Sequence, residues 1–201
     1  MLTIVIQAGG QSRRMGTDKA LIPFQGQPLI SRVIQRVSSI ADEIIVTTNR
    51  PQDYEFLDYP LITDLIPGRG ALGGVYTVLS AASQPMVALV ACDMPFVNHK
   101  LLEAQCTALL EHNADLVIPR LDGGLEPFHA IYDRDSCLPH ILQSIQQARW
   151  RVDSWFSKVN IHFFEKAEIC QHDPHLKSFW NVNTPEELEN ALKLADNEPD
   201  L

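Results

Sequence analysis

Apolar runs and amphipathic stretches alternate along the first quarter of the chain. Residues 2–6 and 44–48 form short, nearly unbroken apolar runs that are rich in β-branched side chains. Such runs are typical of strands that are covered on both faces of a parallel sheet. Between them, apolar residues over residues 29–37 follow helical spacing. This order of strand, helix and strand predicts a βαβ unit with a right-handed crossover.

The same alternation continues through the rest of the chain. The longest apolar run, residues 86–92, predicts a central strand. Further strands are expected at residues 61–63, 115–119, 128–132 and 159–164. Helices are expected over about residues 75–82, after Asn98, between Cys137 and Ile145, and from Pro185. We therefore expect an α/β fold with a mostly parallel sheet, formed as one domain over residues 1–195, with residues 196–201 as a frayed tail.

The first predicted strand ends in a loop, residues 7–19, that combines glycine with basic side chains. Gly9 and Gly10 lack a Cβ atom, so the backbone can turn sharply and approach a ligand closely. Two arginines and Lys19 place three cations within seven residues, which suits phosphate. The spacing matches neither the P-loop nor the dinucleotide-binding fingerprint. An ordinary tight turn explains the glycine pair alone equally well.

Asp93 directly follows the predicted central strand. Ligands of parallel sheets bind at the carboxyl ends of the strands, so Asp93 and Asn49 are expected at the same edge. A carboxylate beside a phosphate loop is a natural ligand for Mg²⁺, which takes one or two carboxylates and completes its shell with phosphate oxygens and water. The alternative is that Asp93 caps the turn before Pro95.

Composition and charge narrow the classes of function. The net charge of −9 argues against nonspecific binding to nucleic acid or to anionic membranes. No stretch approaches the ~20 apolar residues that span a bilayer, and no charged leader with a long apolar segment begins the chain, so we expect a cytoplasmic protein. The cysteines form no C-x-x-C pair. Cys170, His172 and His175 lie close together, but we expect a solvated loop there rather than a metal site.

Residues 8–19 read A-G-G-x-S-x-R-M-G-x-D-K and closely resemble the signature loop of molybdenum cofactor guanylyltransferases, a family of nucleotidyltransferases. Further points of resemblance are Asn49, Asp64, the segment 70–74, Asp93 and the motif N-x-N-T-P-E-x-L at residues 181–188. Two positions depart from the pattern of the family. Gln7 stands where the family commonly has Leu, and Ala71 stands in place of the proline of a Gly-Pro-Leu-x-Gly motif.

The resemblance implies a three-layer α/β/α, Rossmann-like nucleotidyltransferase fold. It also implies transfer of GMP from GTP to the phosphate of the molybdenum-molybdopterin cofactor, with release of pyrophosphate. In such a site Asp93 would hold Mg²⁺, while Lys19 and Arg13 would stabilise negative charge on the phosphates. The residues that the resemblance assigns to the nucleotide are Gln7, Ala8, Gly9, Gly10, Lys19, Asn49, Asp64 and Asp93. Those that it assigns to the second substrate are Gly73, Gly74, Glu126, Asn181 and Asn183.

Some of the second-substrate residues have a structural explanation as well. The glycine-rich segment at residues 67–74 also fits a flexible connector before a helix. Glu126, with His129, is expected to border the second substrate, but an exposed hairpin glutamate fits the same position equally well. Asn181 and Asn183 lie on the same side of an extended segment, just before a capping box that predicts the start of a helix.

Two other classes of function stay open at this point. The first is a related cytidylyltransferase or sugar-phosphate nucleotidyltransferase; the Gly9-Gly10 pair favours guanine by resemblance, because cytidylyl relatives often carry Ala-Ala-Gly. The second is a nucleotide-binding module without turnover. The expected partners are GTP and molybdenum-molybdopterin as small-molecule substrates, with no nucleic acid and no membrane. We expect a monomer that makes transient contacts with cofactor-delivery or recipient proteins.

Overall fold

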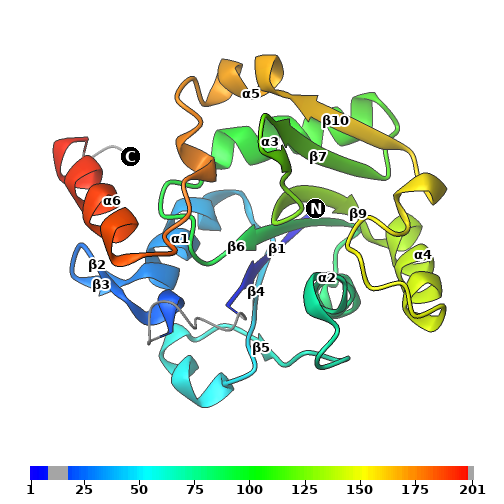
Figure 1. The fold of residues 1–201 in the computed structure, drawn as a ribbon, viewed down its shortest axis with the longest axis horizontal. Helices are drawn as coiled ribbons and strands as arrows, with labels where there is room; N and C mark the ends of the chain where they lie inside the picture. Colours follow the sequence, from blue (N-terminus) through cyan, green and yellow to red (C-terminus); the bar gives the residue numbers. More distant parts are fainter. Residues whose placement is uncertain (9–17, 199–201) are drawn as a thin grey trace.

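A central β-sheet organises the computed structural model, which describes residues 1–8 and 18–198 (Figure 1). The strands lie in the order β10-β7-β9-β6-β1-β4-β5, and β8 pairs with β7. Their bounds are β1 (Leu2–Gln7), β4 (Glu43–Thr47), β5 (Leu61–Ile62), β6 (Met86–Ala91), β7 (Leu116–Leu121), β8 (Gly124–Leu125), β9 (His129–Asp133) and β10 (Ile161–Glu165). A separate small hairpin consists of β2 (Pro23–Phe24) and β3 (Gln27–Pro28).

Most strands of the central sheet run in the same direction. β1 pairs in parallel with β4 on one side and with β6 on the other, β5 runs parallel to β4, and β10 runs parallel to β7. β9 is antiparallel to both β6 and β7. The expected mostly parallel sheet is therefore confirmed. Because β1, β4, β5 and β6 are parallel neighbours, their carboxyl ends meet at one edge, which is where ligands of such sheets bind.

Helices cover both faces of the sheet. Their bounds are α1 (Leu29–Val37), α2 (Gly70–Ala81), α3 (His99–Glu111), α4 (Arg134–Gln146), α5 (Lys166–His172) and α6 (Pro185–Asn197). In the described part of the chain, none of them has the length and apolar character needed to cross a membrane. Figure 1 shows α2 and α4 on one side of the sheet and α1, α3 and α5 on the other. Alternate residues of β1 face the two layers, so Ile4 shares a core cluster with Val33 and Leu102, whereas Val5 shares another with Val78. The expected three-layer α/β/α arrangement is confirmed.

A third and smaller core anchors the C-terminal segment. Ala195 of α6 belongs to the same buried cluster as Phe24, Phe96 and Val182. The cluster thus joins the β2–β3 hairpin and the connection after β6 to the last helix. α6 runs to Asn197, so the helix passes the domain boundary that the sequence suggests at residue 195.

The start of α2 differs from the sequence-based expectation. A glycine-rich loop is predicted at residues 70–74, but these residues form the first turns of the helix. Glycine lowers helix propensity by roughly 1 kcal/mol per residue relative to alanine. Burial of Leu72 and Val75 against the sheet outweighs that cost, because both side chains are fully enclosed in the core.

The solvated loop expected around Cys170, His172 and His175 is partly helical, because residues 166–172 form α5. Glu165 and Glu168 make a capping box in which each side chain accepts a hydrogen bond from the backbone of the other. Ile169 is fully buried on the inner face of the helix. The pairing of two glutamates three residues apart is the sequence signal that identifies this helix.

Candidate active site

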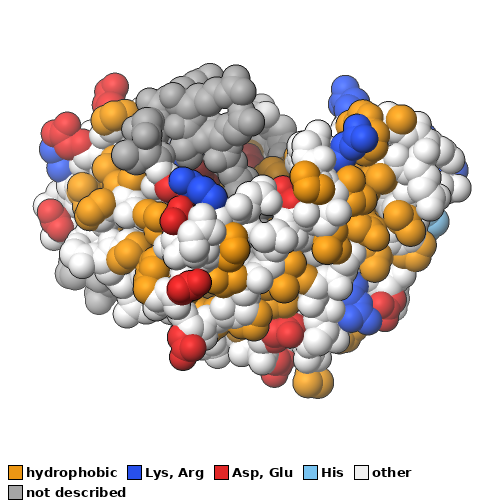
Figure 2. Space-filling model, turned by 90° about the horizontal axis from the view of Figure 1, so that it is seen from below, with side chains coloured by type: hydrophobic (Ala, Val, Ile, Leu, Met, Phe, Trp, Pro, Cys, Tyr) orange, Lys and Arg blue, Asp and Glu red, His pale blue; other side chains and the backbone are white. Residues whose placement is uncertain are grey.

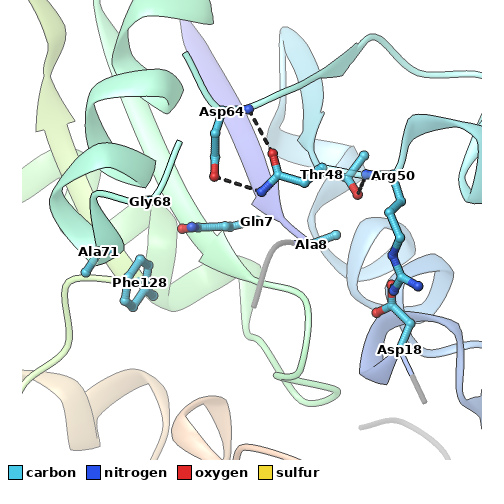
Figure 3. A pocket seen from close by; sticks show the side chains of 11 residues that line it. Gln7, Ala8, Asp18, Thr48, Arg50, Asp64, Gly68, Ala71 and Phe128 are labelled. Carbon is cyan, nitrogen blue, oxygen red and sulfur yellow. Dashed lines mark hydrogen bonds and ion pairs between the residues drawn. The ribbon is translucent and has the colours of Figure 1, made fainter. Parts of the chain in front are cut away.

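A pocket of about 630 Å³ opens at the carboxyl edge of the sheet, beside the N-terminus of α2 (Figure 3). Figure 2 shows the surface hollowed beside the grey atoms. The pocket is lined by Gln7, Ala8, Asp18, Thr48, Asn49, Arg50, Asp64, Gly68, Gly70, Ala71 and Phe128. The residues come from the end of β1, from the segments after β4 and β5, from the start of α2, from the position before the Lys19–Leu21 turn and from the turn before β9. Of the residues expected to bind the nucleotide, Gln7, Ala8, Asn49 and Asp64 therefore lie around one cavity.

Asn49 and Asp64, which both line the pocket, are joined by two hydrogen bonds. Asn49 Nδ2 donates to Asp64 Oδ2 at 2.8 Å, and the backbone N–H of Asp64 donates to Asn49 Oδ1 at 3.3 Å. This reciprocal pair fixes the orientation of the Asn49 amide and holds the end of β5 beside the end of β4. The carboxylate of Asp64 remains directed at the pocket that it lines (Figure 3).

Asp18 joins the start of the Lys19–Leu21 turn to the segment after β4. Its Oδ2 accepts a hydrogen bond from the Tyr54 hydroxyl at 2.8 Å and forms an ion pair with the Arg50 guanidinium, while its Oδ1 accepts from the backbone N–H of Ala20 at 3.2 Å. Burial raises the pKa of Tyr54, and the charge of Asp18 raises it further. Sequence reasoning missed this group, although the position of Asp18 directly before Lys19 in the loop motif was a signal for it.

Lys19 and Asp93 face each other at the same edge. Lys19 Nζ lies 3.7 Å from Asp93 Oδ2, and the two side chains are 20% and 17% exposed. Lys19 Nζ also donates a hydrogen bond to Asn183 Oδ1. Burial raises the pKa of Asp93, the positive charge of Lys19 offsets only part of that shift, and the negative charge of Glu187 adds to it. The arrangement places a lysine beside a carboxylate of raised pKa at the carboxyl edge of the sheet. Neither residue is among those that line the pocket, although Asp18, which directly precedes Lys19, is.

The segment before α6 brings Asn183 to this pair. The backbone N–H of Val182 donates to the carbonyl of Asp93 at 2.9 Å, and the backbone N–H of Asn183 donates to Glu187 Oε2 at 2.7 Å. The Glu187 carboxylate belongs to the capping box that the sequence predicts with Thr184, and both of its reciprocal hydrogen bonds are present. Asn181 instead donates from its Nδ2 to the carbonyl of Phe179 at 3.3 Å.

Gly73 and Gly74 are buried inside α2 rather than exposed in a loop. A Cβ atom on Gly73 would lie 2.9 Å from Arg69 Cβ and 3.1 Å from the Ile66 carbonyl oxygen. A Cβ atom on Gly74 would lie 2.5 Å from Gln7 Nε2. Both glycines therefore have a packing reason to be there, and their contact with a second substrate stays a prediction.

Glu126 and His129 occupy different environments. Glu126 is half-buried, and burial raises the pKa of its carboxyl group. His129 is fully buried, its ring lies 4.8 Å from the Phe179 ring between centroids, and neither ring nitrogen has a hydrogen-bond partner among the described residues. Burial lowers the pKa of His129 to about 4. The imidazole has no exposed surface in this structure, and His129 is not among the residues that line the pocket, so the structure gives no support to its expected place beside the second substrate.

Three residues of the predicted site, Gly9, Gly10 and Arg13, lie outside the described residues. Within the part of the chain that the structure describes, no group of three or more His, Cys, Asp or Glu residues gathers into a metal site. This includes the surroundings of Cys170 and His172, where a metal site was the less favoured alternative. The lone carboxylate of Asp93 is enough for an ion that binds chiefly to phosphate oxygens and water.

Sequence comparisons identify relatives that cover most of the chain. The family model described as the MobA-like NTP transferase domain matches residues 4–159. A probable molybdenum cofactor guanylyltransferase from Natranaerobius thermophilus is 33% identical over 196 residues, which cover 96% of this chain and 95% of that protein. The molybdenum cofactor guanylyltransferase of Desulfosudis oleivorans is 35% identical over 191 residues, which cover 94% of each chain.

Solved structures share the fold over nearly the whole chain. The molybdopterin-guanine dinucleotide biosynthesis protein A of Archaeoglobus fulgidus superimposes with a TM-score of 0.83 at 25% identity, covering 97% of this chain and 99% of that one. A CMP:2-keto-3-deoxy-manno-octonic acid synthetase complexed with CTP superimposes with a TM-score of 0.74 at 17% identity, covering 98% and 99%, which shows the fold alone. The Rossmann-like nucleotidyltransferase fold is therefore confirmed, and the chain belongs to the MobA-like NTP transferase family.

Proposed function

We propose that this protein transfers GMP from GTP to the phosphate of the molybdenum-molybdopterin cofactor and releases pyrophosphate. The observation that carries the proposal is the pairing of Lys19 with Asp93 at 3.7 Å, at the edge of the sheet where the pocket with Asn49 and Asp64 opens. The names of the relatives from Natranaerobius thermophilus and Desulfosudis oleivorans support the same reaction.

The residues of the site perform two tasks, which are binding of the nucleoside and stabilisation of the charge on the phosphates. The pocket that Gln7, Ala8, Asn49 and Asp64 line has the size of a site for a nucleoside. Lys19, together with the backbone N–H groups of residues 8–10 and with Arg13, would stabilise the charge of the triphosphate and of the leaving pyrophosphate. The acceptor is an ionised phosphate and needs no general base, so catalysis is positioning and charge neutralisation.

Membership of an NTP transferase family implies a divalent metal ion, and we propose that this ion is Mg²⁺, held by Asp93. The Asp93 carboxylate fits such an ion because burial raises its pKa and leaves its negative charge only partly compensated by Lys19. When bound, the ion would neutralise charge on phosphate oxygens. Lys19 keeps its contact with Asn183, so this lysine is held in place for the phosphates.

We further propose that the second substrate lies on the side of Asn183 and Glu126. Asn183 accepts a hydrogen bond from Lys19, so it lies next to the cation that the reacting phosphates require. Glu126 lies in the turn before β9, and Phe128 of the same turn lines the pocket. Asn181, Gly73 and Gly74 are further candidates for contact with the second substrate, after Asn183 and Glu126.

The test is to incubate the protein with molybdenum-molybdopterin, Mg²⁺ and either GTP or CTP, and to identify the dinucleotide product and the pyrophosphate released. We expect a guanine dinucleotide, and we expect Lys19→Ala and Asp93→Ala each to lower the rate by at least about 100-fold while the protein stays folded. Lys193→Ala and Asp122→Ala are matched controls, because both residues are exposed and lie outside the site.

Three outcomes would contradict the proposal. A cytosine product would assign the protein to a cytidylyltransferase reaction. Nucleotide binding without pyrophosphate release, in the presence of the acceptor, would indicate a binding module without turnover. Turnover near the wild-type rate in the Lys19→Ala or Asp93→Ala variant would remove these two residues from the mechanism.

A further inference from the structure

The side chain of Gln7 has an unexplained polar atom in the pocket. Gln7 is the last residue of β1, and its side chain lines the cavity with Asp64 and Phe128 (Figure 3). Its Oε1 atom is inaccessible to solvent and has no hydrogen-bond partner among the described residues. A buried carbonyl oxygen without a donor is unfavourable and rare in native proteins. The Gln7 carbonyl oxygen is therefore available to a hydrogen-bond donor that the described residues do not supply.

α2 is shaped to admit this amide. A Cβ atom on Gly74 would lie 2.5 Å from Gln7 Nε2 and 3.5 Å from Gln7 Oε1. Any residue with a side chain at position 74 would push the carboxamide out of its place. The helix accepts a glycine there in spite of its low helix propensity, so the position of the Gln7 amide is built into the packing of β1 against α2.

The acceptors around the pocket match one kind of nucleobase edge. The Asn49–Asp64 pair engages Oδ2 of Asp64, so the second oxygen of that carboxylate is a further acceptor beside the cavity. Guanine carries two neighbouring donors on one edge, its N1–H and its 2-amino group. Cytosine carries one amino group next to an acceptor nitrogen. Two acceptors, from Asp64 and Gln7, therefore complement guanine better than cytosine.

We propose that Gln7 is a specificity-determining residue whose side-chain carbonyl accepts a hydrogen bond from the 2-amino group of the bound guanine base. The inference rests on the proposed function and deepens it, because it names the group that distinguishes guanine from other purines. It also goes beyond the sequence-based expectation for Gln7, which placed this residue at the nucleotide without assigning a role to its side chain. Gly74 acts through Gln7 and is a positioning residue.

The test is a set of equilibrium titrations with GTP, ITP and CTP in the presence of Mg²⁺, on the wild type and on Gln7→Met. ITP is the matched probe because it lacks only the 2-amino group. We expect the wild type to prefer GTP over ITP by about tenfold, the ratio that one hydrogen bond supplies. In Gln7→Met the ratio should approach one, with a melting temperature equal to or above that of the wild type.

Two further variants separate recognition from packing. Gly74→Ala keeps the Gln7 carboxamide but displaces it, so this single variant should have a lower GTP/ITP ratio than the wild type. When it is combined with Gln7→Met, it should not change the ratio further. Gln105→Met is the control, because Gln105 is a fully buried glutamine of α3 whose Oε1 also has no partner among the described residues, and it is not one of the residues that line the pocket. Its GTP/ITP ratio should equal that of the wild type.

The possible failures are distinguishable. If the wild type prefers GTP over ITP and Gln7→Met retains that preference, the role of Gln7 is overturned while the proposed function stands. If Gln7→Met changes the melting temperature but not the ratio, Gln7 serves packing alone. If the wild type binds none of the three nucleotides, or binds CTP most tightly, both the inference and the proposed function fail.

Discussion

At the scale of single residues, the Asp93 carboxylate sits where its charge is least stable. Burial raises its pKa above the ordinary value, and the positive charge of Lys19 does not cancel the effect. A raised pKa in the folded state means that the ionised form destabilises the fold, since stability present at low pH is lost as the pH rises through that pKa. A carboxylate kept in such a place is typical of a functional site.

We therefore expect Asp93→Asn to unfold at a urea midpoint equal to or above that of the wild type at neutral pH, in the absence of divalent ions. The amide keeps the shape of the side chain and removes the buried charge, while it also removes the ligand for the metal, so nucleotidyl transfer should fall sharply. Asp122→Asn is the control, because Asp122 is exposed and its pKa is lowered by Lys166. A clear drop in the urea midpoint of Asp93→Asn would show that its ionised form stabilises the fold.

His129 is a second residue whose environment has a measurable consequence. Its imidazole is fully buried, and its pKa falls to about 4 because burial disfavours the cation, although the charge of Asp173 opposes the shift. The unfolded chain takes up a proton near pH 6.5, but the folded chain does not. Stability is therefore lost as the pH falls from about 6.5 towards about 4.

For the wild type, the His129 contribution should lower the free energy of unfolding by about 2 kcal/mol between about pH 7.5 and about pH 5. His129→Phe lacks the titrating group and should lose that part of the pH dependence, as measured by urea unfolding at both pH values. His175→Gln keeps His129 and changes an exposed histidine, so its pH dependence should match the wild type. Equal pH dependence in His129→Phe and the wild type would contradict this reading of His129.

The residues of the site were predictable to the extent that they follow strand ends. Asp93 and Asn49 could be placed at one edge because parallel strands align their carboxyl ends. The ion pair of Asp18 with Arg50 could not be predicted, because the two residues are far apart in the sequence and no spacing rule joins them. The buried state of His129 also depends on which elements cover β9, which only the assembled fold reveals.

At the scale of elements, the start of α6 couples local structure to the site. Glu187 Oε2 accepts hydrogen bonds from the backbone N–H groups of Asn183 and Thr184, at 2.7 Å and 3.0 Å. One side chain thus caps the helix and fixes the residue that meets Lys19. The capping box was predictable because its pattern is local, whereas the start of α2 was not, because burial against the sheet decides it.

We expect Glu187→Ala to lower the free energy of unfolding by about 1–2 kcal/mol, the usual effect of losing a helix cap. It should also slow nucleotidyl transfer, because Asn183 loses the bond that holds its backbone beside Lys19. Glu186→Ala is the matched control, since Glu186 lies in the same first turn but has no part in the capping box. Urea unfolding and initial rates measure the two effects, and a stability loss without any change in rate would disconnect the cap from the site.

At the scale of the whole molecule, the site depends on several elements at once. The pocket takes residues from β1, from the segments after β4 and β5, from the start of α2 and from the turn before β9. The Lys19–Asp93 pair adds the end of β6 and, through Asn183, the segment before α6. A ligand that binds these elements together binds the folded chain and not the unfolded one, so its binding energy adds to the stability of the entire domain.

GTP with Mg²⁺, at about 100 times its dissociation constant, should therefore raise the free energy of unfolding by about 2.7 kcal/mol. For a domain of this size such an increase corresponds to a rise in melting temperature of roughly 5–10 °C. Chelation of the divalent ion should remove most of the rise, because the negative charges of the triphosphate and of the Asp93 carboxylate then repel each other, and among the described residues only Lys19 offsets the charge of Asp93. Asp93→Asn removes that repulsion, so chelation should affect its melting temperature in GTP far less. A melting temperature that GTP and Mg²⁺ leave unchanged would mean that the strand ends do not form a nucleotide site.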